Sequence, residues 1–149
     1  MKIRKAKKED FKQYLKLVKK SDAEYSKLIG EKIKTNKRQI KKSFNESITS
    51  NKKILLIAEN NKKVVGYLVC SLYISDYQKS GEMDYLFVPK GWKKKGIGKL
   101  LIKEFIDILK NKKLEKCRLD VNIKNISAIN FYKKLGFKIY QYGLEKNLK

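Results

Sequence analysis

The sequence predicts a single α+β domain in which a mixed β-sheet is flanked by helices. Apolar residues recur at three- and four-residue spacing in some segments and gather in short runs in others. The two kinds of segment are interleaved along the chain, which is typical of hairpins combined with helical crossovers. A length of 149 residues fits one domain, and a hydrophobic content of 42% suffices for a core. We therefore expect residues 1–149 to form one domain.

The first third of the chain is expected to supply an edge strand and two helices. Ile3 is apolar between charges, which is compatible with a short edge strand over residues 2–4. Phe11, Tyr14 and Val18 follow helical spacing and predict a helix over 8–20, with acids in its first turn and lysines in its last. A looser stretch follows, and a second helix is expected over about 36–48.

The remaining two thirds are expected to hold most of the sheet. Two apolar runs around the polar Asn60–Lys63 segment have the signature of a hairpin, and Pro89 and Gly91 end the strand that follows. The predicted strands are 54–59, 64–74, 81–88, 117–121, 137–140 and 142–148, and the predicted helices are 96–109 and 127–135. With the N-terminal elements, this makes about seven strands and four helices.

Composition excludes several classes of chemistry. The chain has no histidine, so histidine bases, Ser-His-Asp triads and imidazole zinc sites are ruled out, and we expect no metal. Cys70 and Cys117 are not spaced as a metal or redox pair and are expected to be buried thiols in a reducing compartment. No apolar stretch approaches the roughly 18–20 residues of a membrane span, and the charged N-terminus is unlike a signal peptide. These features predict a cytoplasmic protein.

The formal net charge of +23 favours anionic partners. Nucleic acid, an anionic cofactor and an acidic membrane surface are compatible with it, as is a general lysine bias over solvated faces. Only Arg4, Arg38 and Arg118 are arginines. Because bidentate guanidinium contacts dominate base recognition, we expect at most non-specific contact with nucleic acid. We expect no membrane association.

The segment from Val88 to Leu101 is the strongest local signal. A strand ends, a loop with glycines follows, and an amphipathic helix begins. Gly96 and Gly98 allow a ligand close to the backbone, and the start of a helix offers unpaired N–H donors. Four lysines add positive charge, namely Lys93, Lys94, Lys95 and Lys99. The pattern predicts a pyrophosphate cradle, although an ordinary strand-loop-helix junction would also use glycine here. It fits neither a P-loop nor a dinucleotide fingerprint.

At these residues the chain resembles the GCN5-related N-acetyltransferase (GNAT) superfamily. The family's [QR]-x-x-G-x-[GA] motif is similar to Lys93–Gly98, with lysine where Gln or Arg is usual. The strand before it ends in Phe87-Val88-Pro89. The family's N-x-x-A-x-x-[FY]-Y-x-x-x-G-F segment is similar to Asn125–Phe137. These blocks cover roughly residues 81–140, and the N-terminal third agrees in element order only.

The resemblance implies transfer of an acyl group from acetyl-CoA to a primary amine. The pyrophosphate is then expected on the amides of Lys93–Gly98, with Ile97 inside that turn and Lys99 just beyond it. The pantetheine arm is expected along the main chain of Phe87 and Val88. Asn125 matches a position that often contacts the cofactor arm, and Tyr132 matches a tyrosine commonly placed near the thioester sulfur.

The reaction needs a base, an oxyanion donor and an acid. The Val88 N–H is the expected donor to the thioester oxygen, and the Tyr132 hydroxyl is the expected acid for the leaving thiolate. Glu82 and Asp84 are the candidate bases, because their i, i+2 spacing puts both carboxylates on one face of a strand. Met83, Tyr85 and Phe87 are expected on the other face. Asp84 aligns better with the family's acidic position, and we expect it to act directly or through water.

The resemblance also implies that the acceptor amine enters between the segment joining the first two helices and the final strands. Acids there would hold an ammonium group, and tyrosines would line its path by cation–π contact. The candidates are Asp22, Glu24, Tyr25 and Tyr142. We therefore expect the acceptor to be a cationic small molecule or a peptide amine, although the positive net charge of the chain repels free cations.

Three functions remain open from the sequence. The first is an N-acetyltransferase acting on a small amine. The second is the same chemistry on a protein N-terminus or lysine, for example of a ribosomal protein. The third is a basic, non-catalytic member of the fold that binds nucleic acid, which the intact glycine and Asn125–Phe137 segments argue against. Relatives are often dimers, and nothing in the sequence decides between a monomer and a dimer, or between acetyl and longer acyl donors.

Overall fold

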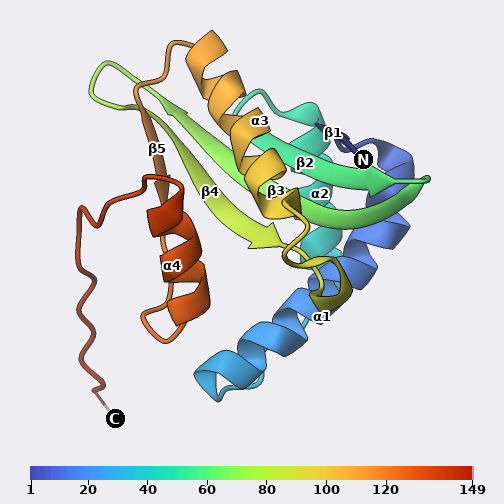
Figure 1. Cartoon of the computed structure of the whole chain (residues 1–149), viewed down its shortest axis with the longest axis horizontal. Coiled ribbons are helices and arrows are strands. Elements are labelled where there is room, and N and C mark those ends of the chain that lie inside the picture. Colours follow the sequence, from blue (N-terminus) through green and yellow to red (C-terminus); the bar gives the residue numbers. More distant parts are fainter. Residues whose placement is uncertain (149) are drawn as a thin grey trace.

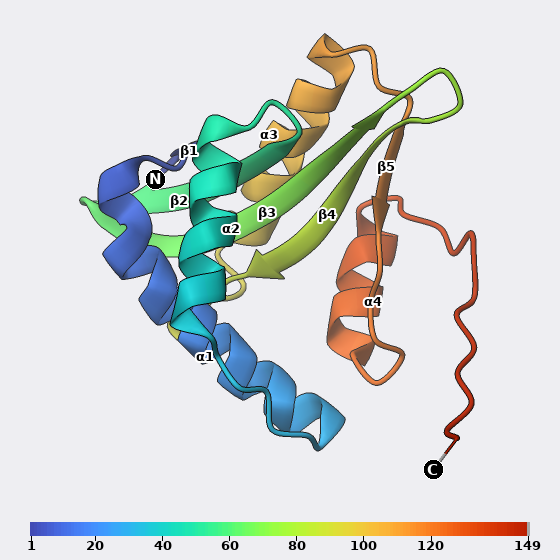
Figure 2. The same cartoon turned by 180° about the vertical axis from the view of Figure 1, so that it is seen from behind.

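A computed structural model describes residues 1–148, which form a five-stranded mixed sheet with helices on both faces (Figures 1 and 2). The strand order is β1-β2-β3-β4-β5, antiparallel throughout except for the parallel pair β4–β5. The strands are β1 (Lys2–Lys5), β2 (Lys53–Asn60), β3 (Lys63–Ile74), β4 (Lys79–Phe87) and β5 (Lys116–Leu119). The α+β class and the mixed sheet predicted from the sequence are confirmed. Residue 149, where the predicted domain ends, lies outside the described residues.

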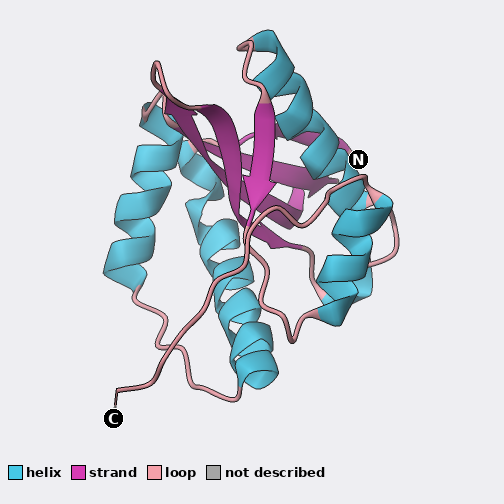
Figure 3. Cartoon of the chain, turned by 90° about the vertical axis from the view of Figure 1, so that its left-hand side faces the viewer, coloured by secondary structure: helices cyan, strands magenta, loops and turns pink. Residues whose placement is uncertain are grey.

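Four α-helices cover the sheet, as expected. They are α1 (Phe11–Ile29), α2 (Lys37–Thr49), α3 (Ile97–Asn111) and α4 (Ile126–Lys134). Viewed from the side, α1 and α2 lie against one face of the sheet and α3 and α4 against the other (Figure 3). Within residues 1–148 no helix is long and apolar enough to cross a membrane.

The first helix runs nine residues further than the sequence predicted. Residues 8–10 form a 3₁₀ turn, and α1 then continues past the lysine pair to Gly30. Gly30 has a φ of 80°, the left-handed conformation that ends helices, and its N–H donates to the Ser26 carbonyl. Lysines near a helix end are favourable but do not stop it, whereas a left-handed glycine does. The extra turns bring Ser21–Leu28 toward the loop before α3.

The core consists of two apolar clusters, one on each face of the sheet. Leu68, Phe105 and Leu101 lie in the cluster under α3, and Tyr67, Phe44 and Phe87 lie in the cluster under α1 and α2. The α3 helix sits unusually close to β4 at Gly81, where an added Cβ would lie 2.7 Å from the Phe105 ring and closer still to Leu109. The absence of a side chain at Gly81 therefore allows α3 to pack this close to the sheet.

An irregularity in the β3–β4 pairing changes which side chains of β4 share a face. Val69 pairs with Tyr85, but Cys70 pairs with Met83, so Asp84 is an extra residue. Met83 belongs to the cluster under α3, whereas Phe87 belongs to the cluster under α1 and α2. The expectation that Met83, Tyr85 and Phe87 face one way is therefore wrong, because a bulge resets the alternation of a strand.

The last two predicted strands, 137–140 and 142–148, are absent from the structure. Residues 135–148 contain no strand, so the sheet has five strands rather than about seven. The two predicted strands were separated by Gln141 alone, and the tightest hairpin needs two loop residues. The segment leaves α4 and runs along the outside of the molecule (Figure 1).

We predict that Gly81→Val lowers the free energy of unfolding by about 2 kcal/mol or more, because the new side chain has to displace Leu109 and Phe105. Gly91→Ala is the matched control, since no heavy atom lies within 4 Å of its added Cβ. Urea unfolding followed by circular dichroism measures both. Equal stability of the two variants would contradict the close packing of α3 on β4.

Candidate active site

A cleft opens where β4 and β5 part. Only Ser80–Met83 of β4 pair with β5, at Lys116–Leu119. Beyond this point, the outer side of β4 has α4 beside it rather than a strand (Figure 1). The resulting cleft has a volume of about 560 Å³. Its walls come from the end of β4, the loop before α3, the start of α3, α4 and the last turns of α1. The cleft therefore brings together residues that are 75 or more positions apart in the sequence, Ser21 and Gly96 among them.

The start of α3 supplies the polar end of this cleft. Gly96 has a φ of 76°, and no side chain caps the helix, so the first amides of α3 keep their donors toward the cleft. An added Cβ on Gly98 would lie 3.2 Å from the Phe131 ring of α4. Glycine at this position therefore allows α3 and α4 to pack closely. Ile97 is buried beneath the turn and fixes it to the core. An uncapped helix start of this kind is the arrangement at which proteins commonly bind anions.

Lysines surround this turn, but they are not equivalent. Lys94 and Lys99 line the cleft. Lys93 also lines it, and its ammonium forms an ion pair with Glu24 of α1 at 2.8 Å. Lys95 does not line it; its ammonium lies 4.8 Å from the centre of the Trp92 ring. Three of the four predicted lysines therefore line the cleft. The ion pair with Glu24 was not predicted, because no local pattern indicates a contact between residues so far apart.

The opposite end of the cleft is mostly apolar. Leu86, Phe87 and Val88 line it from β4, and Phe131 and Tyr132 line it from α4. Asn125 lines it too, where its side-chain oxygen caps α4 by accepting from the Ala128 N–H at 3.2 Å. The cap leaves the Asn125 side-chain amide group to donate elsewhere. The sequence missed Phe131, Trp92 and Ala128, whose apolar character alone could not distinguish lining from core.

Tyr132 is held in a protonated state. Burial raises its pKa to about 12, from an ordinary value of 10.0, with a smaller contribution from Cys117. Its ring packs between Phe131 and Phe137, with centroids 5.4 Å and 5.7 Å away. At neutral pH the hydroxyl is therefore a proton donor in a fixed position on the wall of the cleft.

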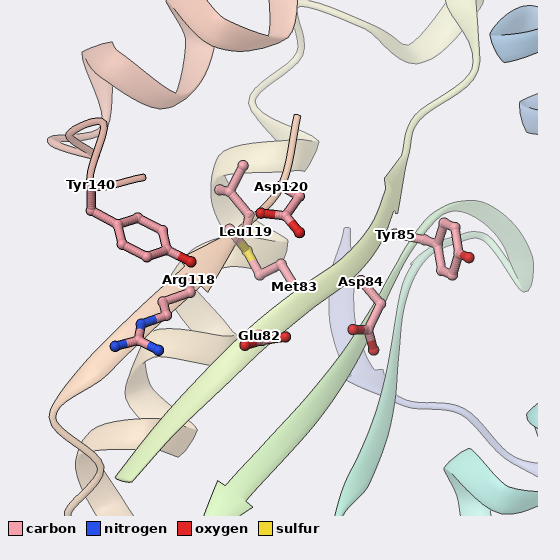
Figure 4. A pocket seen from close by; sticks show the side chains of 8 residues that line it. All are labelled: Glu82, Met83, Asp84, Tyr85, Arg118, Leu119, Asp120 and Tyr140. Carbon is pink, nitrogen blue, oxygen red and sulfur yellow. The ribbon is translucent and has the colours of Figure 1, made fainter. Parts of the chain in front are cut away.

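A second, smaller hollow of about 210 Å³ adjoins the cleft along β4. Glu82–Tyr85 line the hollow, and the next three residues, Leu86–Val88, line the cleft. Both candidate bases thus share one hollow, together with Asp120, which the sequence analysis did not single out because it lies within the predicted strand 117–121. Figure 4 shows the three carboxylates between Tyr140 and Tyr85. Residues 1–148 hold no group of acidic or thiol side chains placed to bind a metal ion.

Asp84 occupies the bulge of β4 and its carboxylate is partly shielded. Burial raises its pKa above the ordinary 3.8, while a hydrogen bond from the Ser71 hydroxyl at 2.7 Å and the charge of Lys53 oppose the rise. A raised pKa makes this carboxylate a better proton acceptor than an ordinary aspartate. The nearby Glu82 carboxylate raises the pKa of the Tyr73 hydroxyl.

The four residues predicted to hold the acceptor do not come together. Tyr25 and Glu24 line the cleft, with Glu24 paired to Lys93. Asp22 instead accepts a hydrogen bond from the Thr35 hydroxyl at 2.7 Å and lines neither cavity. Tyr142 stands exposed in the C-terminal segment, outside both cavities. The acids that do gather are on β4 and after β5.

Comparison with known proteins identifies the family. Residues 15–137 match the profile of the acetyltransferase (GNAT) family. The chain belongs to this family. The resemblance seen at Lys93–Gly98 and Asn125–Phe137 is therefore confirmed at the level of the family.

Two relatives have partial similarity. The chain is 35% identical over 85 residues to N-acetyltransferase MJ1207 from Methanocaldococcus jannaschii, covering 55% of this chain and 38% of that protein. It is 26% identical over 96 residues to N-alpha-acetyltransferase 30 from Schizosaccharomyces pombe, covering 59% and 62%. The chain thus matches less than two thirds of the length of either relative.

Solved structures share the fold. A mutant of the BH1408 protein from Bacillus halodurans has a TM-score of 0.88 at 23% identity, with 100% of both chains covered. The PaiA N-acetyltransferase from Thermoplasma acidophilum, solved with coenzyme A, has a TM-score of 0.80 at 22% identity, covering 95% and 92%. An aminoglycoside acetyltransferase from an uncultured soil sample, solved with sisomicin, has a TM-score of 0.77 at 18% identity, covering 99% and 96%.

We predict that Glu24→Gln tightens coenzyme A binding by about threefold to tenfold, because it removes a negative charge from an anion-binding cleft and frees the Lys93 ammonium. Glu31→Gln makes the same change of charge at an exposed site outside the cleft and should leave binding within about twofold. Calorimetric titration with coenzyme A measures both. Weaker binding by Glu24→Gln would instead mean that the ion pair holds the cleft in shape.

Proposed function

We propose that the protein transfers an acetyl group from acetyl-CoA directly to a primary amine bound in the same complex. The observation that carries the proposal is the cleft at the parting of β4 and β5, which ends on the uncapped, lysine-flanked start of α3. Family membership supports the reaction class.

The cleft fits an acyl-coenzyme A in its chemistry. A diphosphate needs amide donors and positive charge, which Gly96–Lys99, Lys93 and Lys94 offer. The pantetheine arm needs a narrow, mainly apolar path with main-chain partners, which Phe87 and Val88 offer at the end of β4. When bound, acetyl-CoA supplies the activated acetyl thioester.

Three groups around the cleft and the hollow act as base, oxyanion donor and acid in the transfer. Asp84 accepts a proton from the ammonium form of the acceptor, directly or through water, so that the nitrogen can attack. The Val88 N–H donates to the carbonyl oxygen as negative charge develops on it. Tyr132 donates its hydroxyl proton to the departing sulfur as the carbon–sulfur bond breaks, and it takes up the second proton of the attacking nitrogen, directly or through water, so that the amide is neutral and the hydroxyl is restored. Asp84 lies in β4 and Val88 directly follows the end of that strand, so base and oxyanion donor are supported by the same element.

The state of the two thiols supports direct transfer. Burial raises the pKa of Cys117 to about 11 and that of Cys70 further still. Both remain protonated at neutral pH, and a thiol rather than a thiolate is a poor nucleophile. An acetylated cysteine intermediate is thus disfavoured relative to attack by the amine itself.

The hollow favours a cationic acceptor. Glu82, Asp84 and Asp120 concentrate negative charge there in a chain of net charge +23, and Tyr85 and Tyr140 flank them with aromatic surface. We propose a small amine with more than one positive charge, one of them held at Glu82 and Asp120 while the reacting nitrogen meets Asp84.

A peptide N-terminus is the second candidate acceptor. The partial similarity to N-alpha-acetyltransferase 30 favours it. The hollow opens onto a surface that carries exposed Tyr73 and Tyr85, which could flank an extended peptide. The two candidates differ in what lies beyond the reacting nitrogen, a second ammonium group or a peptide backbone.

Calorimetry with acetyl-CoA at low and high salt is the first test, followed by a thiol-release screen over polyamines, aminoglycosides and short peptides. Binding that survives salt, with thiol release on one amine class, is expected. Binding abolished by salt would indicate a general attraction of polyanions to the lysine-rich surface, which falls steeply with salt, and would overturn the proposal.

We predict that Asp84→Asn lowers kcat by about 10²-fold or more, because the acceptor nitrogen then has no base. Acetyl-CoA binding should stay within about twofold, since Asp84 does not line the cleft. Asp120→Asn is the matched comparison and should raise KM for a cationic amine while leaving kcat nearly unchanged. Steady-state thiol release measures both. A larger loss of kcat in Glu82→Gln than in Asp84→Asn would assign the base to Glu82 instead.

We predict that Tyr132→Phe lowers kcat by about 10²-fold with little change in KM. The pKa of Tyr132, about 12, keeps the hydroxyl protonated throughout the working range, so the wild-type rate should show no falling limb as pH rises. The pH profile of kcat measures this. A falling limb near about pH 10 that vanishes in Tyr132→Phe would mean that the tyrosine titrates at an ordinary pKa.

A further inference from the structure

On the face of the sheet under α1 and α2, the apolar core ends part-way along β3. Tyr67 and Val69 are buried in the cluster on this face. Further along the same row, Ser71 is half-buried and Tyr73 is 41% exposed. Side chains of alternate residues share one face of a strand. Ser71 is therefore the first residue of this row that lies outside the core.

Ser71 lies beside the bulge of β4. The β3–β4 register skips Asp84, which has no partner of its own on β3. Asp84 is also exposed. An exposed side chain without a cross-strand neighbour has little packed against it to select one rotamer. The Asp84 carboxylate therefore needs a polar contact if it is to stay in one place.

The Ser71 hydroxyl supplies this contact. It donates a hydrogen bond to Oδ2 of Asp84 at 2.7 Å, and within residues 1–148 no other hydrogen bond reaches this carboxylate. The residue directly opposite Ser71 in the register is Glu82, yet the hydroxyl is turned to Asp84. A carboxylate has two acceptor oxygens, so Oδ1 of Asp84 stays free to take a proton.

We propose that Ser71 is a positioning residue for the acetyl transfer, which holds the Asp84 carboxylate with its free oxygen toward the acceptor nitrogen. The inference rests on the role of Asp84 as base proposed above. A general base has to lie within roughly 2.6–3.2 Å of the atom whose proton it removes. A carboxylate that rotates freely meets this condition only part of the time, and small misplacements lower the rate steeply. Ser71 lines neither cavity, so it acts through Asp84 rather than on the substrate.

The other groups around Asp84 act on it through charge or burial. They are Lys53 of β2, Tyr73 and the buried Cys70 of β3, Glu82 and Tyr85 of β4, Arg118 of β5, and Asp120 and Tyr140 beyond it. Burial raises the pKa of Asp84, and the Ser71 hydrogen bond and the Lys53 charge oppose that rise. Lys53 is opposite Ser71 in the register, but its ammonium donates to Glu46 at 2.8 Å instead of to Asp84. Lys53 thus acts on the charge of Asp84 without holding it.

A matched pair of variants tests the role of the Ser71 hydroxyl. Ser71→Thr and Ser71→Val give side chains of nearly the same shape, but only threonine keeps the hydroxyl. We expect Ser71→Val to lower kcat by about tenfold, with KM and acetyl-CoA binding within about twofold of wild type. Ser71→Thr should retain most of the wild-type kcat. Steady-state thiol release, with the amine that gives release in the screen above, measures both.

The pH profile separates positioning from charge. The Ser71 hydrogen bond stabilises the ionised carboxylate, so its loss raises the pKa of Asp84 and moves the rising limb of kcat/KM to higher pH. Lys53→Gln removes a positive charge and should move the limb in the same direction. It should leave the plateau of kcat within about twofold, because the Ser71 hydrogen bond is still present. A purely structural loss in Ser71→Val would lower the plateau and leave the limb in place.

Carbon-13 NMR of the Asp84 carboxyl group in the free protein gives a second readout that needs no substrate. Its titration midpoint should lie at higher pH in Ser71→Val than in Ser71→Thr. Equal midpoints would overturn the proposal, and so would a wild-type kcat in Ser71→Val when Asp84→Asn has lost its activity. Full activity in Asp84→Asn would instead remove the proposed base, and the role of Ser71 would fall with it.

Discussion

The early separation of β4 from β5 governs the geometry of the whole site. Four residues of each strand pair, and after Met83 the two backbones diverge (Figure 2). Continued pairing would bring β5 against Val88 and close the cleft, so the start of α3 and the wall of α4 would face a strand instead of a ligand. The bulge at Asp84 lies directly after the last paired residue. It turns Asp84 into the hollow and changes the face on which the rest of β4 packs, so one irregular residue lies between the acidic hollow and the cleft.

Electrostatics in this molecule are local in spite of its uniform lysine excess. The cleft concentrates positive charge on the first turn of α3, and Glu24 offsets part of it through Lys93. Along the same strand, the hollow concentrates three carboxylates. The proposed anionic donor and cationic acceptor can thus bind in adjacent cavities, although the net charge of the chain is +23. Screening explains how this works, because at physiological salt a charge acts mainly over about 8 Å, which is less than the width of the domain.

Local sequence signals were reliable where one residue dictates the backbone. Gly96, Pro89 and the run of apolar residues in α3 determined the strand-loop-helix junction, and the structure has it with its predicted boundaries nearly unchanged. The end of α1 was missed because lysines favour a helix end without enforcing one, whereas Gly30 enforces it. The face of the sheet on which Met83 lies was predicted wrongly, because a bulge cannot be recognised from the alternation of residue types. Asp22 and Tyr142 were grouped by the acceptor entry that the family resemblance implies, which says nothing about where side chains point in this chain.

The sequence by itself determined the family, the α+β class, the glycine turn at the start of α3 and the tyrosine of α4, since these depend on motifs and periodicity within short stretches. The tertiary structure alone decided which acids meet. Asp84 and Asp120 are far apart in sequence and adjacent only because β4 and β5 pair in parallel before they diverge. It also decided that Glu24 pairs with Lys93 and that Tyr142, Leu144 and Leu148 lie outside the core. Contacts of this kind depend on how long neighbouring strands remain paired, and that length is set by packing from both faces of the sheet rather than by the residues of either strand.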